Sequence, residues 1–222
     1  MKIIVRIFQF LVGGLFLFSG FIKAVDPLGT SYKMHDYFSA FQTDWPSGKL
    51  LWDIMSTYST QLAVFMLVLE LGLGLALIIG WKNKFTLWLT LALTVFFTFL
   101  TGYTYLSGYT MGHWYNPASW VFNAKDMKVT DCGCFGDFIK LKPYTSFYKD
   151  CVLDFLILVL LIGNKKMYSL FRDRFGNIVV GIGAFASYMF CLSNYYWGLP
   201  MIDFRPYAVG KNIREGMQLP AG

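Results

Sequence analysis

The chain has 222 residues, of which 56% are hydrophobic, 19% aromatic and only 14% charged, and its formal net charge is +6. So few charged residues cannot cover a water-facing surface, which excludes an ordinary soluble domain and predicts an all-α integral membrane protein. The positive charge falls mainly in short loops between apolar segments, so we expect no nucleic-acid partner.

Five segments are apolar over the roughly 20 residues that cross a bilayer core. In chain order these predicted spans are residues 3–21, 61–80, 85–106, 146–163 and 178–199. The first has Lys2 and Arg6 near its start, as a signal peptide also does, but no convincing small-residue cleavage site follows it. The fourth contains Asp150 and Asp154. It is therefore either a span with these two charges at its outer end or a short, partly buried helix.

Basic residues gather in the short loops on one side of this arrangement. They are Lys2, Arg6, Lys82, Lys84, Lys165, Lys166, Arg172 and Arg174. The positive-inside rule makes that side cytoplasmic. The loops 23–60 and 107–145 and the tail from residue 200 then face outward. A bacterial periplasm or cell exterior is a compartment where disulfides persist.

The outward loops are aromatic, and two stretches repeat apolar residues at helical spacing. One stripe is Met34, Phe38 and Phe41, and the other is Leu51, Ile54, Met55 and Tyr58. Both predict interfacial helices, which either anchor the protein at the headgroup level or roof a pocket above the bundle. Further aromatic residues with the same preference for the interface are Trp45, Trp52, Trp114, Tyr115 and Trp120.

Polar and small residues recur at helical spacing inside two spans. The third span has Thr90, Thr94, Thr98 and Thr101, and the fifth has Gly183, Ser187, Cys191 and Asn194. Such stripes predict close packing between helices, and threonine hydroxyls also bond back to their own helix.

Glu70 lies near the middle of the second span, where an ionised carboxylate is costly unless it is paired or hydrated. Lys23 lies near the outer end of the first span, so we expect no basic residue at the depth of Glu70. The alternatives are a protonated or paired carboxylate that serves packing, proton handling for a redox ligand such as a quinone, and passage of an ion or solute.

Cys132 and Cys134 flank Gly133 in the second outward loop. A disulfide between residues i and i+2 closes a very small ring, and strained, exposed disulfides exchange readily. The motif therefore predicts thiol chemistry on the outward side.

Cys151 follows at the outward end of the fourth span, where Asp150 and Asp154 should repel each other and Asp154 could accept a thiol proton. One interpretation is a relay in which a loop cysteine exchanges with Cys151 and then with the deeper Cys191. The alternatives are a structural bond from Cys151 to the loop, and two free buried thiols.

A metal site is the other chemistry that the loop residues suggest. His35 and His113 with the two loop cysteines could form a soft-metal set, but their spacing does not favour one, and we expect no metal. No catalytic triad motif or phosphate-binding glycine loop is present in the sequence.

Three motifs carry a resemblance to known families. The run LFLFSGFIKAVDPLG at 15–29 resembles the opening of DoxX-family membrane proteins, and ELGLG at 70–74 resembles the acidic second helix of that superfamily. CGCFG at 132–136 resembles the related MauE proteins, which are implicated in disulfide formation during periplasmic maturation of methylamine dehydrogenase. The resemblance covers roughly residues 3–163.

The resemblance implies a four-helix bundle with a redox role, connected to quinone as in thiosulfate:quinone oxidoreductase relatives. This chain adds a fifth span within 164–199 and an outward tail over 200–222. We expect a bundle over 1–163 whose outward loop, about 107–145, carries the cysteine pair.

The sequence thus predicts a bacterial inner-membrane protein with a cytoplasmic N-terminus. Its Cys132 and Cys134 would exchange disulfides or electrons with a thioredoxin-like or substrate protein outside the cytoplasm. The alternative is a non-enzymatic scaffold of an envelope complex, in which the cysteines form a structural disulfide.

Overall fold

The computed structural model describes residues 2–110, 121–122, 127–129, 139, 141–171 and 173–196. Its elements are α1 (Lys2–Val25), α2 (Pro27–Asp44), η1 (Pro46–Gly48), α3 (Lys49–Thr57), α4 (Ser59–Ile79), α5 (Asn83–Ser107), β1 (Tyr109–Thr110), β2 (Val121–Phe122), α6 (Pro143–Ile162), η4 (Asn164–Lys166) and α7 (Asp173–Tyr196). The two short strands pair antiparallel. The described part of the chain is therefore almost entirely helical, as predicted.

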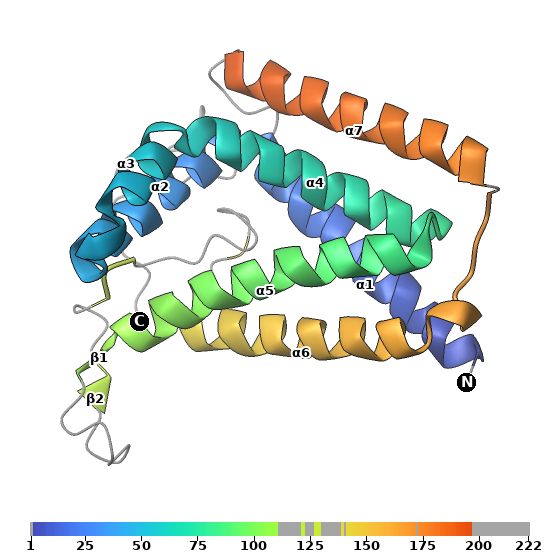
Figure 1. The fold of residues 1–222 in the computed structure, drawn as a ribbon, viewed down its shortest axis with the longest axis horizontal. Helices are drawn as coiled ribbons and strands as arrows, with labels where there is room; N and C mark the ends of the chain where they lie inside the picture. The colour runs from blue at the N-terminus through green and yellow to red at the C-terminus, as the bar shows by residue number, and fades with distance from the viewer. Residues whose placement is uncertain are drawn as a thin grey trace, which may run out of the picture.

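Five long helices form the bundle, with α7 on one side and α6 on the other (Figure 1). The helix α4 packs against α1, α2, α5 and α7, while α6 packs mainly against α5. The short helices α2 and α3 fold over one end of the bundle (Figure 1). Apolar side chains of α1, α4, α5 and α6 make the main core, with Val12, Leu77, Leu87 and Ile157 at its centre.

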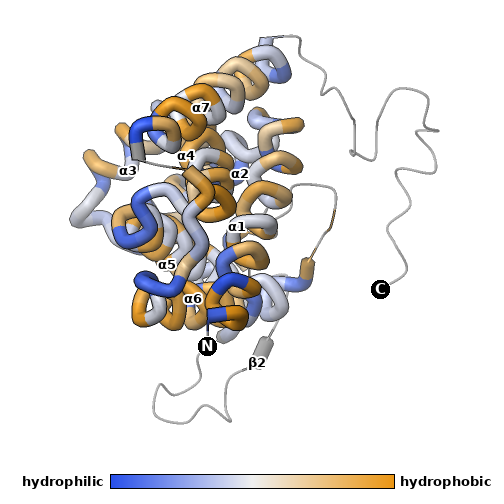
Figure 2. Tube along the Cα trace, turned by 90° about the vertical axis from the view of Figure 1, so that its right-hand side faces the viewer, coloured by the Kyte–Doolittle hydropathy of each residue, from blue (hydrophilic) through white to orange (hydrophobic). Residues whose placement is uncertain are grey.

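Within the described part of the chain, four helices have the length and composition to cross a membrane. They are Lys2–Val25, Ser59–Ile79, Asn83–Ser107 and Arg174–Tyr196. These correspond to the first, second, third and fifth predicted spans, and Figure 2 shows that hydrophobic residues predominate in the bundle helices. The protein is therefore a multi-pass membrane protein.

The helix α6 is not among these four, although the sequence predicts a span there. Every 18-residue window of α6 includes Lys149, Asp150 and Asp154, which is too much charge for an ordinary span. The helix is nevertheless 20 residues long and lies along α5. Whether α6 crosses the membrane remains a prediction.

Glycines let α1 and α4 approach closely. A Cβ atom at Gly74 would lie 2.8 Å from the backbone nitrogen of Leu17, and one at Gly13 would lie 3.2 Å from the carbonyl oxygen of Gly74. Since backbone atoms cannot move aside as a flexible side chain can, both positions require glycine. This crossing fixes the two helices that carry Lys23 and Glu70.

The polar stripes predicted for α5 and α7 have the expected roles. Thr90, Thr94 and Thr98 each donate a hydrogen bond to the carbonyl oxygen four residues earlier. In α7, Cys191 is fully buried, and Asn194 Nδ2 donates to Ala24 O at 2.9 Å. Both stripes therefore serve helix packing, as predicted.

Gln9 holds the connection between α6 and α7 against the bundle. Its Nε2 donates to Leu77 O at 2.7 Å and to Tyr168 O at 2.9 Å, and its Oε1 accepts from Tyr168 N at 2.8 Å. The side chain is fully buried. It therefore links α1, α4 and the segment after η4 at the end where α1 begins.

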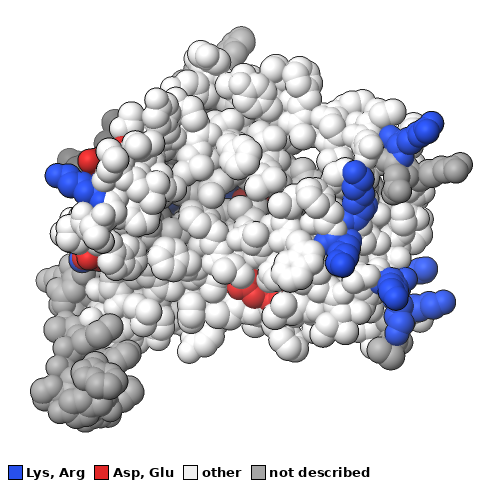
Figure 3. Space-filling model, in the orientation of Figure 1, with Lys and Arg blue, Asp and Glu red and all other residues white. Residues whose placement is uncertain are grey.

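Seven lysines and arginines of the described residues lie at that same end, whereas the opposite end shows basic and acidic side chains together (Figure 3). The seven belong to the start of α1, the α4–α5 turn, η4 and the start of α7: Lys2, Arg6, Lys82, Lys84, Lys165, Lys166 and Arg174. The predicted charge asymmetry is thus present in the fold. The assignment of this end to the cytoplasm remains a prediction.

The two predicted interfacial stripes differ. In α2, Met34, Phe38 and Phe41 are buried against α4 and α5, so this helix roofs the bundle. In α3, Leu51 and Ile54 are exposed, as an interfacial face requires. Trp114, Tyr115 and Trp120 lie outside the described residues.

Candidate functional site

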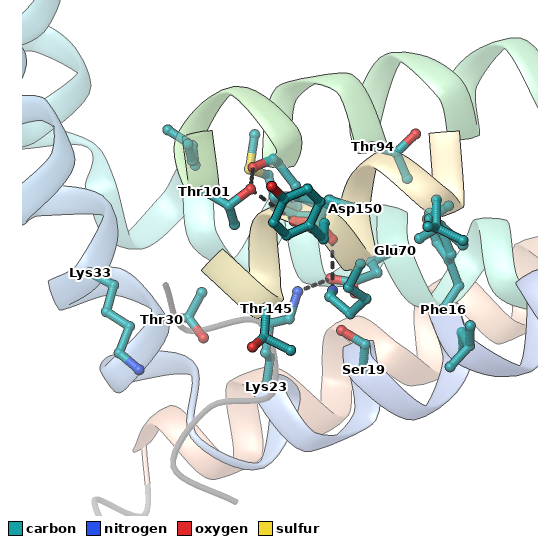
Figure 4. Close-up of a pocket in the computed structure, with 18 of the residues that line it drawn as sticks. Phe16, Ser19, Lys23, Thr30, Lys33, Glu70, Thr94, Thr101, Thr145 and Asp150 are labelled. Atoms are coloured by element: carbon teal, nitrogen blue, oxygen red, sulfur yellow. Dashed lines mark hydrogen bonds and ion pairs between the residues drawn. The ribbon is translucent and has the colours of Figure 1, made fainter. Parts of the chain in front are cut away.

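A cavity of about 710 Å³ is lined by residues of α1, α2, α4, α5 and α6 (Figure 4). Its walls are mostly apolar, and they include Leu11, Leu15, Phe16, Met34, Met66, Leu67, Phe97, Leu100, Val152, Leu153 and Leu156. Its polar groups include Ser19, Lys23, Thr30, Lys33, Tyr37, Glu70, Thr94, Thr101, Tyr144, Thr145, Tyr148, Lys149 and Asp150. A cavity of this size suits a small-molecule ligand.

Glu70 is paired with Lys23 inside this cavity. Lys23 Nζ lies 2.7 Å from Glu70 Oε2, and the two residues are 6% and 3% exposed. The ammonium also lies 4.5 Å from the centre of the Phe97 ring. The expectation that no basic residue reaches the depth of Glu70 is therefore wrong.

The pair forms because helical side chains point toward the N-terminus of their own helix. Since α1 and α4 run in opposite directions, Lys23 reaches inward from the end of α1 while Glu70 reaches outward from the middle of α4. The predicted depth of each residue was counted from its position in the sequence, which ignores the direction of its side chain. With that direction included, Lys23 would be predicted as the partner of Glu70.

A second ion pair lines the cavity from α6. Lys149 Nζ lies 2.7 Å from Asp150 Oδ1, and Thr101 Oγ1 donates to Asp150 Oδ2 at 3.0 Å. One turn later, Thr98 Oγ1 donates to Asp154 Oδ2 at 2.7 Å. The threonine ladder of α5 thus holds each of the two carboxylates that the sequence expects to repel. Lys149 and Thr98 were not predicted to take part in this site.

Met34 and Tyr37 of α2 line the cavity, and an aromatic cluster around Phe41 packs beside Tyr37. The ring centre of Phe41 lies 4.9 Å from that of Tyr103 and 5.2 Å from that of Trp52. Beside it, Tyr37 OH and Thr104 Oγ1 share a hydrogen bond of 2.6 Å. The alternative that the aromatic residues roof a pocket is therefore correct for α2.

Lys128 and Val129 attach the α5–α6 connection to this roof. Lys128 forms an ion pair with Asp44, and Tyr103 OH donates to Asp44 Oδ2 at 2.6 Å. The hydrogen bond from Lys128, and then that from Tyr103, lowers the pKa of Asp44 below its usual value. Val129 is buried in the cluster that contains Met34 and Leu100, which also line the cavity.

The predicted cysteine sites divide into three groups. Cys132 and Cys134 lie outside the described residues. Cys151 is a half-buried free thiol in α6, next to Asp150. Cys191 is a free thiol buried among Ala24, Val64 and Leu67. Since α6 and α7 lie on opposite sides of the bundle (Figure 1), the structure does not bring Cys151 and Cys191 together.

Among the described residues, no group of three or more His, Cys, Asp or Glu side chains could hold a metal ion. His35 is exposed on α2, with Nδ1 3.5 Å from Ser39 Oγ. His113 lies outside the described residues.

Comparison with known proteins identifies the family. Residues 1–111, which contain α1 through α5, match the family model of methylamine utilisation protein MauE. The match ends before Cys132, so the cysteine loop contributes nothing to it, and the wider DoxX relationship remains a prediction. No curated protein and no solved structure matches the chain. Because the match covers 111 of its 222 residues, the chain belongs to the MauE family of redox-associated membrane proteins.

Proposed function

We propose that this protein is a thiol–disulfide oxidoreductase of the bacterial inner membrane. Its N-terminus lies in the cytoplasm, and Cys132 and Cys134 exchange with a thioredoxin-like or substrate protein on the outward side. The basic residues at the start of α1 and in the inner turns support this orientation. Membership of the MauE family supports the redox role.

The attachment of Lys128 and Val129 is the observation that carries the proposal. Val129 is buried under α2, and it precedes Cys132 by only three residues. The segment that leads into the Cys132–Cys134 motif therefore begins at a residue fixed against α2 and α5.

The exchange balances without another reactant. A thiolate of the partner attacks the Cys132–Cys134 disulfide, so a mixed disulfide forms and one of the two cysteines leaves as a thiolate. The second thiol of the partner then breaks the mixed disulfide. The partner is oxidised to a disulfide, Cys132 and Cys134 are reduced to two thiols, and the reverse reaction follows the same steps.

The other predicted site residues have subordinate roles in this proposal. Cys151 is partly exposed near the outward start of α6, so we assign it as a second exchange thiol, with Asp154 on the same helix as the proton acceptor. Cys191 is fully buried beside α1 and α4. We therefore assign Cys191 to packing rather than to exchange.

A trapping experiment tests the exchange. In a Cys134→Ser variant, Cys132 cannot be resolved by its neighbour, so a mixed disulfide with the partner should accumulate and disappear on reduction. The matched control is Cys191→Ser, which should trap nothing. If neither Cys132→Ser nor Cys134→Ser traps a partner, the alternative of a scaffold with a structural disulfide replaces this proposal.

A further inference from the structure

The cavity opens at the surface between α1 and α6. Leu11 and Leu15 of α1 are 45% and 39% exposed, and Tyr148 and Val152 of α6 are 60% and 59% exposed. All four residues also line the cavity. Since α1 has the length and composition of a membrane span, the opening beside it faces hydrocarbon and admits an apolar chain.

The two helices give the cavity an apolar end and a polar end. Val5 of α1 and Gly163 of α6 meet at the end where α1 begins, since a Cβ atom at Gly163 would lie 2.9 Å from Val5 Cγ2. About two helical turns from this contact, Leu11 and Leu156 line the cavity. The helices run in opposite directions, so the other end of the cavity holds the end of α1 and the start of α6 (Figure 1).

Polar side chains gather at that other end. Thr30 and Lys33 come from α2, Lys23 from the last turn of α1, and Tyr144 and Thr145 from the first turn of α6 (Figure 4). The first turn of a helix has backbone N–H groups without intrahelical partners and carries a partial positive charge. In α6 this turn contains no acidic residue, and no side chain of the described residues caps it. It therefore favours a negative group on a ligand.

The charged side chains of the cavity lining have the same preference. Among the described lining residues, the three lysines are Lys23, Lys33 and Lys149, and the two carboxylates are Glu70 and Asp150. Their formal charges therefore sum to +1. A head with one negative charge brings the total of lining and ligand to zero, which a neutral head does not, and an uncompensated charge is costly in a largely apolar cavity.

We infer that the cavity binds an acyl lipid whose head carries one negative charge. The head lies between Lys33 and the first turn of α6, where N–H groups and the Thr145 hydroxyl donate to its oxygens. The acyl chain extends along Leu15 and Leu153 toward the apolar end and reaches the bilayer between α1 and α6. A carboxylate and a phosphodiester both fit this head site, so the source is a free fatty acid or an anionic phospholipid. The lipid is bound without chemical change, so no step of thiol exchange is required.

An oleate analogue with a diazirine on its acyl chain, used to label the purified full chain in phosphatidylcholine nanodiscs, tests the head site. Lys33→Gln should weaken saturable labelling by about tenfold, which corresponds to about 1.4 kcal/mol. The matched control is Lys142→Gln, which removes an exposed charge next to the start of α6 that does not line the cavity. Its affinity should equal that of the wild type. Equal affinities in the two variants, weakened or not, would overturn the inference.

A second pair of variants tests the site of the acyl chain and does not depend on Lys33. Val152→Trp should fill the α6 rim and weaken labelling by about tenfold. Leu158→Trp is the control, because Leu158 is 47% exposed on the same helix and does not line the cavity. If Val152→Trp binds the probe with the affinity of the wild type, the lipid site is wrong.

Competition on the wild type identifies the head. Unlabelled oleate should displace the probe, whereas oleyl alcohol, which has the same chain and a neutral head, should not. Equal displacement by the two would mean that the cavity selects only the chain, which also overturns the inference. When oleate is selected, displacement by added phosphatidylglycerol as well assigns the site to an anionic phospholipid, and displacement by oleate alone assigns it to a free fatty acid.

Discussion

The ammonium of Lys23 lies 2.7 Å from the carboxylate of Glu70, in the cavity between α1, α4 and α5. The pair joins the outer end of one helix to the middle of another, and both side chains are buried. Removing one partner of a buried pair leaves an uncompensated charge. Loss of one partner should therefore lower the stability of the fold as well as change the cavity.

Glu70→Gln should lower the free energy of unfolding by roughly 3–5 kcal/mol, because Lys23 then remains buried without its counter-charge. Thermal unfolding in detergent measures the change. The double variant Lys23→Met/Glu70→Leu removes both charges and should recover most of the loss. A single variant as stable as the wild type would show that the pair is hydrated and not buried.

Gly74→Ala should destabilise the protein by about 1–3 kcal/mol, since the added Cβ meets the backbone of Leu17. Gly181→Ala is the matched control, because nothing lies within 4 Å of a Cβ at that helical position. Its helix propensity should make it neutral or slightly stabilising. Equal melting temperatures for the two variants would contradict the close α1–α4 crossing.

Gln9→Leu should loosen the connection between α6 and α7. It removes the side-chain partner of the backbone N–H and carbonyl of Tyr168, at about 1–3 kcal/mol for each group left unpaired, whereas Leu77 O still accepts from Gly80 N. Protease cleavage near Tyr168 should become faster. In the control Thr90→Val, only a bond within α5 is lost, so cleavage should be unchanged.

The attachment of Lys128 should depend on the charge of Asp44. Because the pKa of Asp44 is lowered in the folded protein, the stabilisation is present at neutral pH and is lost as the pH falls below about 4, through the folded-state pKa. At neutral pH, Asp44→Asn should reproduce that loss and increase the alkylation rates of Cys132 and Cys134.

Asp53→Asn is the control for this experiment, since Asp53 is exposed on α3. It should leave both alkylation rates at the values of the wild type. Unchanged rates in Asp44→Asn would mean that the Lys128 attachment does not hold the cysteine loop.

Hydropathy alone predicted α1, α4, α5 and α7, because each has a long apolar run with few charges. The helix α6 is harder to predict as a span, since Asp150 and Asp154 interrupt its apolar pattern and their partners, Lys149 and the threonines of α5, are seen only in the fold. The sequence does not distinguish a roof formed by α2 from an interfacial anchor, because a stripe of apolar residues looks the same whether it faces a core or a membrane surface.

The site was less predictable than the fold. Glu70 stands out as a charge in an apolar span, but its partner is found only when the direction of each side chain along its helix is considered together with its depth. Lys149 was not predicted for a different reason, since an isolated lysine near a predicted helix end has no signal of its own. The cysteine motif was found by its spacing, and its chemistry remains a proposal.

The most direct test of the account is the redox state of Cys132 and Cys134 in intact cells, measured by acid trapping, alkylation and mass shift. Cys191→Ser is the control and should behave as the wild type does. We predict a mixture of reduced and oxidised pairs that shifts toward the reduced form under mild reductant. A pair that is uniformly oxidised and resists mild reductant would contradict thiol exchange and indicate a structural disulfide.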